Sequence, residues 1–257
     1  MKKLAAHFAI IVAGILLALA VDEWRQEREE LEIASEHLSD VASELRDNLC
    51  TVERIRARLL QQRMENLQTV LNFLNDPAAP VEDPAALLQA FARSTAGARP
   101  WLVDNQFHAL QNSGNVRLVR KLQPDLNLAG LYGGPAVLFS QIDRIQGAYP
   151  VVVNELIPAQ LQVRFSQLSG YARDRKAPAL VDDDDLPRTV EGIRARRAEL
   201  LGLARNEAAV ATAKWYALAR IRQDLEEVLV SLAQWDRSPT SVAEELVDCA
   251  APRRPQR

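Results

Sequence analysis

Histidines and cysteines come first among the residues that could do chemistry, because imidazoles and thiolates bind metals, carry protons and act as nucleophiles. The chain has three histidines, His7, His37 and His108, and two cysteines, Cys50 and Cys249. No second histidine or cysteine stands four residues from any histidine, as a helical metal site requires, and the cysteines form no C-x-x-C pair. The sequence therefore predicts no metal site and no cofactor.

The two cysteines are candidates for a disulfide, since an even cysteine count suits an exported protein in an oxidising compartment. Cys50 stands five residues after Leu45 of the apolar seam described below, so we expect it on the outer side of its helix. A bridge between Cys50 and Cys249 would tie the C-terminal segment to the first long helix. An intermolecular bridge and two free thiols are the alternatives.

A run of four aspartates at 182–185 could bind Ca²⁺ through its carboxylate oxygens. The spacing differs from that of an EF-hand loop, and adjacent like charges repel one another unless they are solvated. We expect a solvated loop whose last acids stabilise the N-terminus of a helix from Arg188, with Ca²⁺ binding as the alternative.

Acid–base residues such as Asp104 and Glu155 are available for catalysis, but the sequence places no second reactive group beside either of them. Nothing in the chain reaches the level of a catalytic motif. We therefore predict a protein that is not an enzyme.

The elements that carry these residues begin with an apolar segment. Leu4–Val21 has no formal charge, follows Lys2 and Lys3, and runs into Asp22 and Glu23. A transmembrane helix needs roughly 20 apolar residues, and positive charge favours the cytoplasmic side. We expect a single-pass anchor in the inner (cytoplasmic) membrane, with an inside N-terminus and an extracytoplasmic, periplasmic domain.

The flanks of this segment carry residues typical of a membrane interface, with Lys2 and Lys3 on one side and Trp24 and Arg25 on the other. Ala18-Leu19-Ala20 resembles a signal-peptide cleavage site, so a cleaved leader is the alternative. No proline or glycine interrupts the helical pattern after Gly14, which favours an uncleaved anchor. Gly14 and Ala18 also form a small-residue pair that would let two such helices dimerise.

A heptad seam follows the apolar segment. Leucines or valines recur seven residues apart at positions 31, 38, 45, 52 and 59, and a second row at 34, 41 and 55 is interrupted by Asn48. This pattern predicts a long helix over 22–75 that packs along a partner helix, with a phase slip after Gln62. Asn48 either fixes the register of a coiled-coil dimer or lies at the edge of an intramolecular bundle.

The middle of the chain, 76–187, reads as short helices and an acidic loop. We expect a helix over Trp101–Gln111, one ending at Gly133-Gly134-Pro135 where another begins, and one over Val151–Leu168 bent or interrupted at Pro158. The aromatic side chains of Trp101, Phe107 and Tyr132 could line a pocket.

A second seam, with apolar residues at 204, 211, 218, 225 and 232, predicts a long C-terminal helix over 188–236 that runs back along the first. A tail follows at 237–257, with a short helix near Val242–Val247. The expected fold is therefore all-α: an anchor at 1–21 continuous with a long helix, packed in an extracytoplasmic antiparallel helical bundle whose short helices form a distal lobe.

Two segments resemble a bacterial family of single-pass membrane proteins of unknown function. Gly14–Trp24 is similar to the family's apolar helix ending in a polar pair and a tryptophan, and Phe107–Val119 is similar to its helix closing in Ser-Gly. Asp22 and Glu23 stand where the family usually has amides, and the region after Gly133 matches none of its patterns. The resemblance implies a membrane topology and no activity.

Composition leaves the function open. A net charge of −3 with interspersed signs gives no electrostatic footprint for nucleic acid. We expect a protein-interaction or envelope scaffold module whose partners are the membrane and another envelope protein, with a homodimer as an option. The alternative is a small-molecule-binding sensor domain that signals through a partner.

Overall fold

A computed structural model of the chain describes residues 2–76, 78–97, 100–124, 126–145, 147–166, 185–236 and 249, with the backbone alone at 2–10, 122, 163–166 and 234–236. The described residues form helices and their connections, which confirms the all-α fold. The elements are α1 (Lys2–Arg54), the π-helix η1 (Ile55–Leu60), α2 (Gln61–Asn75), α3 (Pro84–Ser94), α4 (Asn105–Asn112), α5 (Val116–Leu122), α6 (Leu128–Arg144), α7 (Tyr149–Leu156), α8 (Ala159–Ser166), α9 (Asp185–Ala195) and α10 (Arg197–Asp236).

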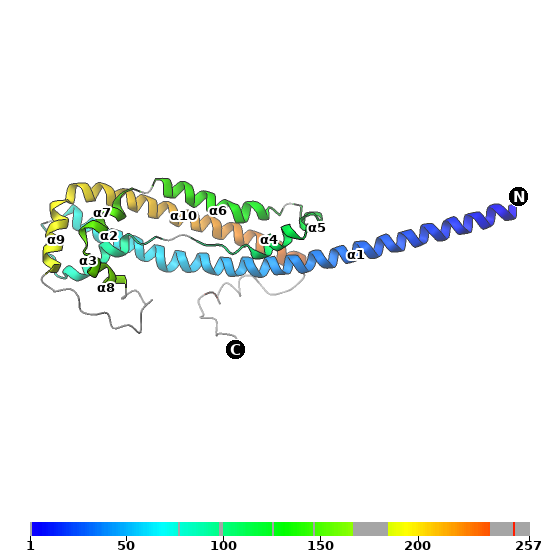
Figure 1. The fold of residues 1–257 in the computed structure, drawn as a ribbon, viewed down its shortest axis with the longest axis horizontal. Helices are drawn as coiled ribbons and strands as arrows, with labels where there is room; N and C mark the ends of the chain where they lie inside the picture. The colour runs from blue at the N-terminus through cyan, green and yellow to red at the C-terminus, as the bar shows by residue number, and fades with distance from the viewer. Residues whose placement is uncertain are drawn as a thin grey trace, which may run out of the picture.

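The bundle is built on two long helical runs that lie side by side (Figure 1). The first is α1–η1–α2 and the second is α10. Ion pairs join Glu53 to Arg222 and Arg63 to Glu207, so residue numbers rise along one run while they fall along the other. This is the antiparallel packing that the two seams predict.

The short helices do not form one distal lobe. α3, α7, α8 and α9 gather at the far end of the bundle, whereas α4, α5 and α6 lie along the long helices towards the end where α1 leaves (Figure 1). The predicted 188–236 helix is also divided, because α9 ends at Ala195 and α10 begins at Arg197.

The predicted seams are buried along most of their length. In α1 the seam residues Leu38, Leu45 and Val52 are buried, as are those of α10 at 204, 211, 218, 225 and 232. The prediction was wrong at Leu31 and Leu59, which are exposed. Leu31 lies where α1 leaves the bundle, and Leu59 lies within the π-helix.

The phase slip of the first seam occurs in the π-helix Ile55–Leu60, and not after Gln62 as predicted. Its wider turn adds one residue, so the buried row continues from Val52 to Leu60 after eight residues instead of seven, and then to Leu67 and Leu74. The second row shifts in the same way and brings Arg63 into a buried position.

Asn48 belongs to the intramolecular bundle, and it explains why the predicted helix over Trp101–Gln111 is too long. Its Nδ2 donates to the Val103 carbonyl and its Oδ1 accepts from the Val103 N–H, both at 2.8 Å. This paired contact holds the chain extended before α4, which begins only at Asn105.

Gly133, Gly134 and Pro135 do not end a helix, contrary to the sequence-based prediction, since α6 runs through them. The buried side chains of Leu128, Phe139 and Ile142 belong to one core cluster, and their burial offsets the roughly 3 kcal/mol that an internal proline costs. Pro158 does interrupt its helix, as predicted, and separates α7 from α8.

The N-terminal part of α1 projects from the bundle (Figure 1). The side chains of Ile15, Leu17 and Leu19 in this part are largely exposed. The predicted span at Leu4–Val21 includes residues 4–10, whose side chains lie outside the described residues. Within the described part of the chain, no helix combines the length and the hydropathy needed to cross a bilayer. The predicted short helix at Val242–Val247 and aspartates 182–184 also lie outside that part.

Candidate functional site

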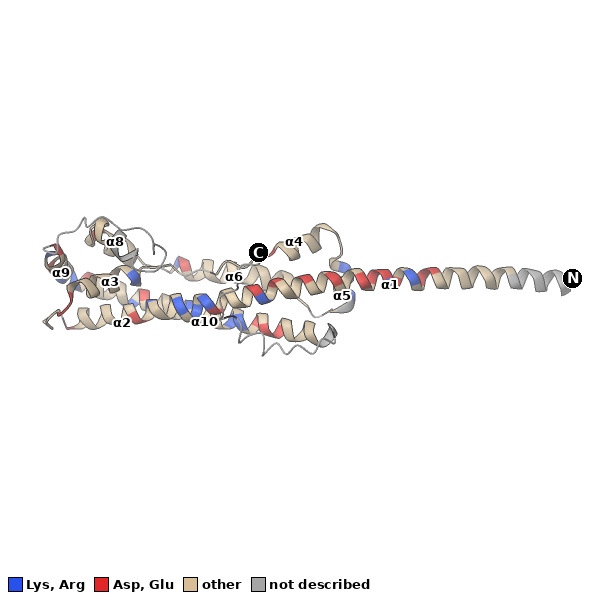
Figure 2. Cartoon of the chain, turned by 90° about the horizontal axis from the view of Figure 1, so that it is seen from below, with Lys and Arg blue, Asp and Glu red and all other residues tan. Residues whose placement is uncertain are grey.

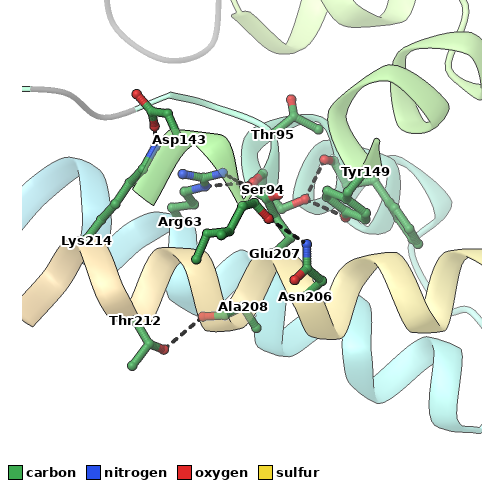
Figure 3. Close-up of polar contacts among 12 residues, drawn as sticks. Arg63, Ser94, Thr95, Asp143, Tyr149, Asn206, Glu207, Ala208, Thr212 and Lys214 are labelled. Carbon is green, nitrogen blue, oxygen red and sulfur yellow. Dashed lines mark hydrogen bonds and ion pairs between the residues drawn. The ribbon is translucent and has the colours of Figure 1, made fainter. Parts of the chain in front are cut away.

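The most unusual polar site joins the two long runs near the distal end. Arg63 of α2 forms an ion pair with Glu207 of α10, and their side chains are 1% and 0% exposed (Figure 3). Arg63 Nε also donates to the carbonyl oxygen of Ser94 at 2.9 Å, at the C-terminal end of α3. A cation at this position stabilises the last carbonyls of a helix, so one arginine links three helices.

Ser94 extends this network to α7. Its hydroxyl donates to the carbonyl oxygen of Phe91 at 2.7 Å and lies 2.7 Å from the hydroxyl of Tyr149, which then acts as donor (Figure 3). Burial raises the pKa of the Tyr149 phenol above its ordinary value, so the group stays protonated.

Burial dominates the electrostatics of the ion pair. It lowers the pKa of Arg63 and raises the pKa of Glu207, while the opposite charge of each partner works against the shift. Arg63 Nη1 and Glu207 Oε2 are buried without a hydrogen-bond partner among the described residues. Such a pair is costly to break, because either residue alone would leave a buried charge uncompensated.

A neighbouring ion pair fixes α6 to α10. Lys214 Nζ lies 2.6 Å from Asp143 Oδ1, and Lys214 is buried although Asp143 is partly exposed (Figure 3). Lys214 stands seven residues after Glu207, so both charged residues occupy the row of α10 that also contains Ile221.

A second polar cluster lies nearer to the end where α1 leaves the bundle. The Glu44 carboxylate of α1 accepts from the Tyr132 hydroxyl at 2.7 Å and from the Gln106 N–H at 2.8 Å. The second bond caps the first turn of α4, whose own N-cap residue, Asp104, makes no such bond. Burial and the hydrogen bond to Glu44 raise the pKa of Tyr132.

The predicted aromatic pocket is only partly assembled. Phe107 and Tyr132 stack with ring centroids 5.1 Å apart, and the pair belongs to the core. Trp101 does not join them, since it is 84% exposed on the extended segment before α4. A separate cavity of about 40 Å³ lies between α1 and α10, lined by Ser35, Leu38, Ser39, Ala42, Arg46, Leu232 and Ala233. Its volume is far below the roughly 300 Å³ of a small ligand pocket.

The two cysteines are joined. Cys50 and Cys249 form a disulfide with their Cα atoms 5.1 Å apart. Among the membrane-interface candidates, the side chains of Lys2 and Lys3 lie outside the described residues, whereas Trp24 is 61% exposed with the guanidinium of Arg28 over its ring.

Arg25, the last of these interface candidates, pairs with Glu29 at 3.5 Å. The histidines lie apart from one another. His108 pairs with Asp104 at 3.2 Å on the surface, and His37 accepts from Asn115. Nowhere in the described part of the chain do three potential metal ligands gather.

The buried networks hold helices together. A solute could reach Arg63 and Glu207 only if α2 and α10 separated, because the core covers both. Neither residue was predicted from the sequence, although a signal was present. Positions 207 and 214 continue the row of Ile221 and Val228 by steps of seven, and a charged residue in an otherwise apolar row marks a buried partner.

Comparisons with known proteins gave no match. The chain matches no protein-family model, no curated protein and no solved structure. The family resemblance of Gly14–Trp24 and Phe107–Val119 thus stays a prediction.

Proposed function

We propose that this protein is a membrane-anchored, extracytoplasmic scaffold that holds an interaction surface away from the bilayer. The observation that carries the proposal is the continuity of α1, which passes from a projecting apolar segment into the bundle core as one helix. From Val21 to Asn75 the helical run spans about 80 Å at 1.5 Å per residue.

The exposed side chains of α1 support the anchor. A lone helix in water gains nothing from leucines and isoleucines on all its faces, whereas a helix surrounded by lipid buries them. Leu16, Leu17 and Leu19 point in different directions around the helix axis and are each more than half exposed. The disulfide supports export, because such bonds persist in oxidising compartments.

The bundle suits a scaffold better than a sensor or an enzyme. Its buried charges link α2 to α3 and α10, α10 to α6, and α1 to α4 and α6. Each of these contacts fixes one helix relative to another. The sensor alternative rests on the aromatic pair, and Tyr132 is already engaged by Phe107 and Glu44.

Membrane fractionation of the full chain tests the anchor. We expect the chain in the carbonate-washed membrane pellet, and a Val12→Arg, Ile15→Arg variant in the soluble fraction, because an arginine near the centre of the span opposes insertion by about 3 kcal/mol. The matched control, Val137→Arg with Val151→Arg, adds two arginines at exposed apolar positions of the bundle and should stay in the pellet. A wild-type chain released by carbonate would overturn the anchor.

In-cell photo-crosslinking tests the scaffold role. A photoreactive amino acid at Val151, exposed on the distal α7, should capture an envelope protein, whereas one at Tyr216, exposed in the middle of α10, serves as the control. Equal capture at both positions, or none from several exposed positions of α7 and α9, would refute a distal interaction surface.

A further inference from the structure

The basic face of α5 carries the inference that we draw beyond the scaffold role. We propose that α5 is a membrane-contacting foot, whose arginines bind anionic lipid headgroups and set the tilt of the bundle on the bilayer. This proposal rests on the proposed membrane anchor.

The helix has two faces of opposite character. Leu118 and Val119 are buried against the bundle, whereas Arg117, Arg120 and Lys121 are exposed. Spacings of three and four residues place these three cations on one side of a helix. All the charged residues on the outward surface of α5 are therefore basic.

The contacts of α5 with α1 direct it towards the projecting end of α1. At the start of α5, Asn115 Nδ2 donates to His37 Nε2 at 2.9 Å. At its end, Lys121 Nζ lies 3.4 Å from Glu27 and 3.8 Å from Glu30. The helix thus descends along α1 from His37 towards Glu27, and Figure 1 shows α5 beside the point where α1 leaves the bundle.

This position brings the foot close to the expected bilayer surface. Glu27 lies six residues after Val21, the end of the apolar segment, which corresponds to about 9 Å along the helix. That distance is comparable with the Debye length of about 8 Å at physiological ionic strength, so the end of α5 at Lys121 lies within reach of headgroup charges, and a tilt of α1 would bring Arg117 and Arg120 closer to them.

Charge complementarity selects anionic lipid as the occupant. Lys121 is engaged by α1, whereas no ion pair joins Arg117 or Arg120 to any other described residue. The adjacent part of α1 is acidic, as the red ribbon between the apolar segment and the bundle shows (Figure 2). Between Asp22 and Glu32 it carries six carboxylates and two arginines, Arg25 and Arg28; the carboxylates are Asp22, Glu23, Glu27, Glu29, Glu30 and Glu32. An anionic surface repels these carboxylates and attracts the arginines, so α1 would tilt until α5 faces the lipid.

Hydrogen–deuterium exchange of the full chain in nanodiscs tests the proposal. Nanodiscs of phosphatidylcholine alone are compared with nanodiscs in which roughly a third of the lipid is phosphatidylglycerol. We expect exchange in peptides covering Ser113–Gln123 to slow several-fold only with the anionic lipid, and the slowing to disappear at high salt.

The Arg117→Gln, Arg120→Gln variant should lose this slowing while Lys121 keeps α5 on α1. The matched control is Arg54→Gln with Arg58→Gln. Both arginines are exposed and lie in the α1–η1–α2 run, far from α5, so this variant should behave as wild type. Equal exchange in both lipids, or a slowing that survives the α5 substitutions, would overturn the foot, and an acidic protein would then be the better candidate for this face. A chain that does not enter nanodiscs at all would instead refute the anchor.

Discussion

At the residue scale, the Arg63–Glu207 pair determines how the two long helical runs are joined. We expect Arg63→Met or Glu207→Leu alone to lower the free energy of unfolding by about 3 to 5 kcal/mol, because each leaves one buried charge without its partner. The double variant should recover most of the loss. Denaturant unfolding of the full chain in detergent, followed by circular dichroism, measures this coupling.

The control for this cycle is Arg58→Met, which removes an exposed arginine of the same helical run. It should change the unfolding free energy by less than about 0.5 kcal/mol. Equal losses for the two single variants and the double variant, with no recovery, would mean that the core tolerates neither apolar replacement and that pairing is not what these residues contribute.

Tyr132 makes stability depend on alkaline pH. Its pKa is raised in the folded chain, so the folded phenol keeps its proton where the unfolded phenol loses it. Its contribution is therefore present below the ordinary pKa of 10 and is lost as the pH rises above that value. We expect Tyr132→Phe to flatten this decline, measured as unfolding free energy against pH.

The surface residue Tyr216 provides the control, as Tyr216→Phe, for this pH series. A Tyr132→Phe variant whose stability falls as steeply as that of wild type would show that the Glu44–Tyr132 bond does not link folding to the phenol proton.

At the element scale, the π-helix contains one residue more than a continuous α-helix would hold. Deleting the exposed Ala57 should convert η1 into α-helix and leave both flanking seams facing α10, so we expect the unfolding free energy to change by no more than about 1 kcal/mol. Deleting the exposed Ala209 of α10 is the matched control. It turns every later residue by about 100° and should cost more than about 4 kcal/mol.

A deletion of Ala57 that unfolds the chain would mean that the flanks are not in continuous α-helical register, and that the extra residue is required for packing. π-helical turns are frequent at functional sites. If the chain without Ala57 folds but no longer captures a partner in the photo-crosslinking experiment, the π-helix has a role in binding.

The long helices could be predicted from sequence because spacing alone fixes which side of a helix is apolar. The extended segment at Val103 could not, since a tertiary contact with Asn48 overrides the helical preference of its residues. The same holds for α6, where burial of Phe139 outweighs Pro135. The burial of Glu207 could have been predicted only by allowing a charged residue in a buried row of α10. Such rows are recognised by their apolar residues, so the pattern itself argued against a buried glutamate.

At the scale of the whole molecule, the bond between Cys50 and Cys249 closes a loop of most of the chain, with a sequence separation of 199. We expect reduction to lower the unfolding free energy by about 2 to 4 kcal/mol. Intact mass with thiol labelling before and after reduction establishes the pairing, and denaturant unfolding with and without reductant measures its effect.

The Cys50→Ser, Cys249→Ser variant is the control, because its unfolding should not respond to reductant. Thiols of the wild-type chain that label fully without reduction would contradict the bridge. A covalent dimer would contradict an intramolecular pairing.

The uninterrupted course of α1 has a mechanical meaning. Because α1 is one continuous helix from Lys2 to Arg54, a torque applied at its N-terminal end is transmitted along the helix to the bundle. The first place where the hydrogen-bonding pattern changes is η1, so torsion that passes the proximal core would be absorbed there, just before Arg63. Torsion applied to the apolar segment would therefore strain the hydrogen bonds of η1 and leave the Arg63–Glu207 contact beyond it undisturbed.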